Sequence, residues 1–262
     1  MQAVGATMFL RTSTALCSLF ILASMTCAED VIALPADPAL PVIELWYVDH
    51  GQLRAPEIAI FSSGRVQVRV GDGTLWGELQ REQVLSLMRT LLKRDQLASL
   101  QTAEIEADIV AESIRTGLSC EIKQGGDTII RVRTAAAVYR VDGHAVGLLS
   151  ARFPNVERLQ YLYSAQRRLE NVRAVVMVGG PSTAERLARL AQLKLQAESG
   201  EQILVGQENL SYVHSLTDGT RCCQFLVPAP HGSESAPRII SLFESPGETP
   251  RVSVLPDTSS LQ

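Results

Sequence analysis

The chain has few of the residues from which metal and catalytic centres are usually built. It holds four histidines and five cysteines in 262 residues. The histidines do not form the H-E-x-x-H pattern of a zinc enzyme, and the cysteines do not form the C-x-x-C pattern of a dithiol oxidoreductase. The nucleophile elbow G-x-S-x-G is also absent. We therefore expect no metal or cofactor, and a serine hydrolase has no local support.

Long apolar runs, aromatic residues and excess positive charge are scarce as well. After residue 30 no apolar run approaches the roughly 20 residues of a membrane-spanning helix. Aromatic residues make up 5% of the chain, which is low for a carbohydrate-binding surface, and the net charge is −4. An acidic chain is poorly suited to electrostatic capture of nucleic acid or anionic lipid. We expect no nucleic-acid partner and no stable membrane span in the mature chain.

Residues 1–28 have the order of a secretory signal peptide. Arg11 is the one charged side chain in this stretch, and the apolar core at 15–23 is followed by small residues that end at Ala28. This core has about half the length that a bilayer-spanning helix needs. We expect cleavage after Ala28 and export of the mature chain, as a secreted or periplasmic protein.

Cys27 offers an alternative to simple export, since it could become the lipid-modified first residue of a membrane-tethered lipoprotein. The leucine that usually stands three positions before such a cysteine is missing, because Ser24 stands there. The match is poor, and export in soluble form is the favoured interpretation.

The mature chain would have the size and composition of a globular protein. Removal of 28 residues from 262 leaves 234, and the chain is 46% apolar and 20% charged. Grouped strands outnumber helices, which favours an α+β fold with antiparallel-rich sheets and three main helices. We expect an extended lead-in at 29–40, an α+β domain at 41–172, and a smaller α+β segment at 173–262 that ends in strands and a frayed tail.

The first part of the mature chain changes from period-two to helical patterning and back. Val66, Val68 and Val70 alternate with polar residues, as in a half-buried strand. Val84, Leu87, Met88, Leu91 and Leu92 recur at spacings of three and four, as in an amphipathic helix. The expected strands are 42–50, 57–62, 65–70, 118–123, 128–133 and 137–142, with helices at 81–97 and from a cap at Asn155 to about 171; residues 101–116 are either a helix or an ordered loop.

The second part of the mature chain, from residue 173 onwards, is predicted to form a short strand, a helix and a group of strands. The apolar run 174–178 predicts a buried strand, which leads through Gly179-Gly180-Pro181 into a helix over 182–197. The later strands are expected at 203–205, 210–216, 221–227, 238–243 and 251–255.

The turn before the second-part helix is a candidate anion site. Backbone amides at a helix start attract negative charge, and Gly179, Gly180, Ser182 and Thr183 lie at such a start. The simpler interpretation is a helix cap, because Ser182 and Glu185 have the spacing of a capping box.

Three cysteines would remain after removal of the signal peptide: Cys120, Cys222 and Cys223. In their expected strands, Cys120 shares a face with Leu118 and Ile122, and Cys223 shares one with Phe225 and Val227. Both are therefore expected to face the core. A Cys120–Cys223 disulfide would tie the two parts together, and free thiols are the alternative.

Trp46 is the candidate binding residue. It lies on the strand face opposite Ile43, Leu45 and Tyr47. If the sheet is covered on both sides Trp46 belongs to the core, and if one side is open Trp46 is available to a ligand.

These observations favour an exported non-catalytic protein that binds an unknown ligand or an envelope protein. The alternatives are an exported hydrolase, whose site would be assembled from residues distant in sequence, and a lipoprotein anchored through Cys27. A pocket in which His144 or His214 meets an acid and a nucleophile would favour the hydrolase.

Overall fold

The computed structural model describes residues 32–49, 52–53, 55–199, 204–215, 219–227 and 238–255. The predicted signal peptide with Cys27, and the histidines His50 and His231, lie outside the described residues. The lead-in from Ile32 to Leu40 forms no helix or strand, and its Leu34 side chain is buried in the first core.

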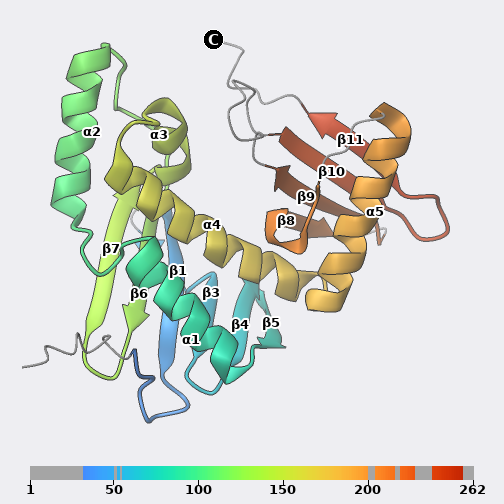
Figure 1. The fold of residues 1–262 in the computed structure, drawn as a ribbon, viewed down its shortest axis with the longest axis horizontal. Helices are drawn as coiled ribbons and strands as arrows, with labels where there is room; N and C mark the ends of the chain where they lie inside the picture. Colours follow the sequence, from blue (N-terminus) through green and yellow to red (C-terminus); the bar gives the residue numbers. More distant parts are fainter. Residues whose placement is uncertain are drawn as a thin grey trace, which may run out of the picture. The chain divides into compact units, whose positions relative to one another are not determined.

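The first sheet is antiparallel throughout and has the strand order β5-β4-β3-β1-β6-β7, with β2 paired to β1 (Figure 1). Its alternating residues place Val66 and Val68 in the core and leave Arg65 exposed. The strands are β1 Pro41–Asp49, β2 Gln52–Leu53, β3 Ile58–Phe61, β4 Arg65–Val70, β5 Gly73–Glu78, β6 Asp127–Arg133 and β7 Val138–His144.

Helices cover one face of this sheet. Figure 1 shows α1 and α4 lying across the same side of it, and their buried side chains join those of the strands in one hydrophobic core. The helices of this part are α1 Arg81–Arg89, its π-helical continuation η1 Thr90–Arg94, α2 Thr102–Thr116, α3 Val146–Arg152 and α4 Glu157–Met177.

The second sheet has four antiparallel strands in the order β11-β10-β9-β8. Phe225, Ile240 and Leu242 of this sheet share a second core with the apolar face of α5. The elements are α5 Pro181–Ser199, the 3-10 turn η2 Gln207–Asn209, β8 Leu210–Ser215, β9 Arg221–Val227, β10 Arg238–Glu244 and β11 Arg251–Leu255.

One helix contributes to both cores. Leu162 and Leu169 of α4 lie in the first core, whereas Ala174 and the capping residue Val178 lie in the second. The Asn171 amide donates to the carbonyl oxygens of Gln207 and Leu210, both at 2.8 Å. The proposed boundary after residue 172 falls inside this helix.

The strand predicted at 174–178 is wrong, because these residues are the last turns of α4 and its cap. A five-residue apolar run fits a strand and a buried helix turn equally well. The helix closes where Gly179 N–H donates to Val176 O at 3.0 Å and Gly180 N–H to Val175 O at 2.8 Å. Both glycines have positive φ, as this helix ending requires.

Other boundaries also differ from the sequence predictions. Residues 118–123 form no strand, and the N-cap of α4 is Val156 and not Asn155. Residues 102–116 form a helix, which ends at Gly117 with a left-handed backbone conformation. The described residues contain five α-helices, whereas three main ones were expected. The α+β class with antiparallel sheets is confirmed. Within the described ranges no helix has both the length and the apolarity to cross a membrane.

Candidate binding surface

The two faces of β1 have different surroundings. Ile43 and Leu45 are fully buried beneath the helices, and the Tyr47 hydroxyl donates to the Glu170 carboxylate of α4. Trp46 lies on the opposite face, as the sequence predicts, and the described helices bury their apolar side chains on the first face only. We call the second face the open face. By strand register it includes Glu44, Trp46, Ala59, Phe61, Arg65, Gln67, Trp76, Ile129, Arg131 and Arg140.

At the centre of the open face, Arg131 links Trp46 to Glu44. The Arg131 guanidinium carbon lies 5.7 Å from the Trp46 ring centroid, and its Nε lies 3.0 Å from Glu44 Oε2. Glu44 is only 5% exposed. Burial raises the pKa of Glu44, and the positive charges of Arg131 and Arg133 oppose that shift. The pair is therefore a partly buried ion pair whose arginine also makes a cation–π contact with an indole.

The Trp46 indole N–H is buried and has no acceptor among the described residues. A buried donor without a partner costs about 1–3 kcal/mol. Arg131 lies against the same ring. A partner that supplied an oxygen atom to this N–H would relieve that cost.

A second aromatic group lies at the β5 end of the same face. Trp76 is 51% exposed, Arg65 Cζ lies 4.2 Å from its ring centroid, and the Phe61 ring lies 6.2 Å away. Trp76 and Arg65 come from neighbouring strands, and the stacking holds both in place without burying them. Tryptophan and arginine are the side chains that most often dominate the binding energy of protein interfaces.

Strand register connects the two aromatic groups. Cross-strand neighbours form a row across six strands, in the order Trp76, Gln67, Ala59, Glu44, Arg131 and Arg140. Five strand spacings correspond to about 24 Å. Arg140 is held by a bidentate contact to Asp142, at 2.9 and 2.8 Å. The row is long enough for an extended ligand of several residues.

The candidate anion site at 179–183 takes a different form from that predicted. Ala184 N–H donates to Gly180 O at 3.1 Å and the helix begins at Pro181, so the capping residue is Gly180 and not Ser182. The glycines join two helices and do not follow a strand. Ser182 and Thr183 lie within the first turn of α5, and the capping box predicted for Ser182 and Glu185 is wrong.

The three described cysteines are free thiols in this structure, which does not contain the Cys120–Cys223 linkage. Cys120 packs at the edge of the first core, in a segment without a strand. Cys223 is fully buried in the second core beside Phe225, as predicted, and burial raises its pKa to about 12. Burial also raises the pKa of the half-buried Cys222. Whether the exported protein forms the linkage stays a prediction.

The two described histidines both make contacts that are explained by a structural role. His144 Nδ1 lies 2.7 Å from Asp127 Oδ1, and its Nε2 lies 2.8 Å from the Ile122 carbonyl oxygen. Both ring nitrogens are therefore engaged, and neither is available to activate a nucleophile. The His214 ring stacks on Tyr212 at 6.4 Å. Within the described part of the chain, no three histidine, cysteine or acidic side chains gather as a metal site would require.

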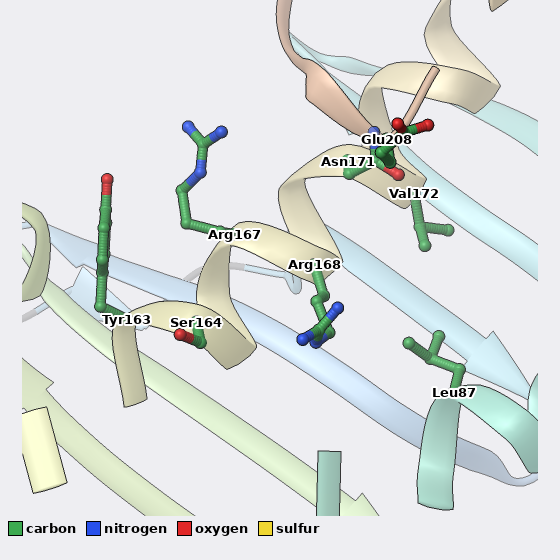
Figure 2. Close-up of a pocket in the computed structure, with 8 residues that line it drawn as sticks. All are labelled: Leu87, Tyr163, Ser164, Arg167, Arg168, Asn171, Val172 and Glu208. Carbon is green, nitrogen blue, oxygen red and sulfur yellow. The ribbon is translucent and has the colours of Figure 1, made fainter. Parts of the chain in front are cut away.

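A hollow of about 380 Å³ lies along α4 (Figure 2). Its polar groups mostly have partners elsewhere: Arg168 pairs with the buried Asp95 at 2.7 Å, and Asn171 supports the carbonyls before β8. Figure 2 shows Arg167 pointing away from Arg168, so the two cations do not converge. This hollow is explained by structural contacts and is a weaker candidate than the open face.

Sequence reasoning identified Trp46 and missed the residues that surround it. Arg131, Glu44, Arg65 and Trp76 are brought together by pairing between strands far apart in sequence. The alternation of Arg65 and Gln67 with valines was the one local signal, because it showed which side chains leave the core.

Comparison with known proteins gives no match: no family model, no curated protein and no solved structure is significantly similar to this chain.

Proposed function

We propose that this chain is an exported, non-catalytic binding protein of the cell envelope that holds a protein partner on the open face of its first sheet. The observation that carries the proposal is the Trp46 group. An indole with an unsatisfied buried N–H makes a cation–π contact with Arg131, on a sheet face that no described helix covers.

Two further features support a protein partner. Trp76 and Arg65 form a second stacked pair on the same face. Arg131 pairs with Glu44 at the centre of the face and Arg140 pairs with Asp142 on β7, so contact over these strands need not bury a charge without its partner. Export rests on the signal-peptide pattern of residues 1–28.

The proposal can be tested by site-specific photocrosslinking in the exporting cell. A photoreactive side chain placed at Gln67, directly beside Trp76 in the row, should give one dominant crosslinked protein. The same group at Leu148 of α3, which is exposed and lies outside the open face, is the control. Adding Trp46→Ala should reduce the crosslink from position 67 at least fivefold. Equal products from both positions, or a yield that Trp46→Ala leaves unchanged, would remove the proposal.

A further inference from the structure

The β5 strand is an open sheet edge. Among the described residues it pairs only with β4. The other edge of this sheet is protected, since Thr102 of α2 bonds to both the N–H and the carbonyl of Asp142 in β7, at 3.0 and 3.1 Å. On β5, Leu75 is 42% exposed and Trp76 is also exposed. A free edge with large apolar side chains is a site for pairing with another strand.

The direction of the free backbone groups follows from the register. Leu79 N–H donates to Gly64 O at 2.8 Å, so the backbone of residue 79 points towards β4. Because this direction alternates along a strand, the N–H and C=O groups of Thr74, Trp76 and Glu78 point away from β4.

A hollow of about 380 Å³ lies beside this edge on the helix-covered side. Val176 of α4 forms part of its wall and packs directly on Gly77, where a Cβ would lie only 2.7 Å from Val176 Cγ2. The remaining walls include Val172, Val175 and Pro181. An apolar side chain placed opposite Gly77 would meet these groups.

We infer that the partner of this edge is a second copy of the same strand, paired antiparallel about a twofold axis at Trp76. In that register Leu75 of one copy lies opposite Gly77 of the other, so each exposed leucine fills the other copy's hollow. Thr74 lies opposite Glu78, and the two Trp76 residues meet on the open face. The pairs 74–78, 76–76 and 78–74 supply about six main-chain hydrogen bonds. The inference does not depend on the proposed function.

Self-complementarity favours a second copy over an unrelated extended segment. The projecting side chain and the hollow are two residues apart on one strand, and a twofold axis between them matches both at once. Glu78 is the one charged residue of β5, and in this register it faces a threonine and not its own copy. An interface formed by one six-residue strand from each copy is small. Small interfaces belong to the weak class, so the association should depend on protein concentration.

Sedimentation of the purified mature chain at concentrations from roughly 1 to 500 µM, which test for a micromolar dissociation constant, should show reversible dimerisation. Leu75→Lys should weaken the association constant at least tenfold. Val254→Lys, on the outer strand β11 of the second sheet, is the matched control, because Val254 is also exposed, and it should change nothing. A chain that stays monomeric throughout, or a dimer weakened only by Val254→Lys, would overturn the inference.

A second measurement tests the register. Paired Trp76 residues would have Cα atoms about 5.5 Å apart, within reach of a disulfide. Under mild oxidation Trp76→Cys should therefore give a 76–76 linkage, identified by peptide mapping. Thr74→Cys should not, because the two copies of residue 74 would lie about 14 Å apart. Equal linkage of both variants, or no 76–76 linkage, would contradict the twofold pairing.

Discussion

Replacement of Arg131 by methionine tests the charge arrangement on the open face. Methionine keeps an apolar stem over Trp46 and removes the charge that faces Glu44. Leaving a buried charge without its partner costs about 3–5 kcal/mol. Arg131 is one-third exposed and Arg133 still attracts Glu44, so we expect a loss of about 2 kcal/mol in the free energy of unfolding at neutral pH.

The loss should depend on pH in a defined direction. Burial places the pKa of Glu44 above its ordinary value of 4.5 in the folded state, and removing Arg131 raises it further. The folded state of the variant is therefore penalised above that pKa, where Glu44 must be ionised. The penalty should fade below about pH 4.5, where the carboxyl is protonated in both the folded and the unfolded chain.

Urea unfolding followed by tryptophan fluorescence measures this loss, because both tryptophans of the chain lie in the first sheet. The matched comparison introduces Arg131→Met with and without Glu44→Gln. With the neutral amide at position 44, the cost of Arg131→Met should fall below about half of its value and lose its pH dependence. An equal cost in both backgrounds at neutral pH would refute the buried-carboxylate reasoning.

Three other outcomes are expected. Both ring nitrogens of His144 contact acceptors, which raises its pKa. The contribution of His144 to stability is therefore complete below about pH 6.5 and is lost as the pH rises through the folded-state pKa. His144→Ala should flatten the dependence of stability on pH in that range, and an unchanged dependence would contradict this role. Leu162→Ala in the first core should cost about 2–5 kcal/mol by denaturant unfolding, and a cost below about 1 kcal/mol would contradict its close packing. N-terminal sequencing of exported protein should begin at Glu29, and a start at Cys27 with attached lipid would support the tethered alternative.

The sequence predicts this fold best where one face of a helix or strand is buried and the other face is exposed to solvent. Val66 and Val68 alternate with polar residues, and both are fully buried while Arg65 is exposed. The run at 174–178 has no polar residue to reveal a period, and there the strand prediction is wrong. Its helical state depends on α4 continuing from the first core into the second, which is a property of the tertiary structure.

The open face could be predicted only in part, for a related reason. The alternation around Trp46 predicts which way its side chain points. Its neighbour Arg131 follows from pairing between β1 and β6, about 85 residues apart, and that pairing places β1 in the middle of the sheet. Trp76 joins the same face through three intervening strand pairs. The local sequence pattern therefore predicts to which face of the sheet a side chain points, whereas the pairing of distant strands decides which side chains are neighbours.

The two proposed surfaces overlap at β5, where Trp76 belongs to both, whereas Trp46 and Leu75 each belong to one, so their consequences can be told apart. Trp46 lies three strands away from the β5 edge, and Trp46→Ala should reduce partner crosslinking and leave self-association unchanged. Leu75 points to the helix-covered side, and Leu75→Lys should weaken self-association at least tenfold without affecting the Trp46 group. If copies do pair through β5, their open faces join into one surface with Trp76 at its centre. A single extended partner could then contact both Trp46 groups, and Leu75→Lys would weaken capture of that partner more than it weakens capture of a short fragment.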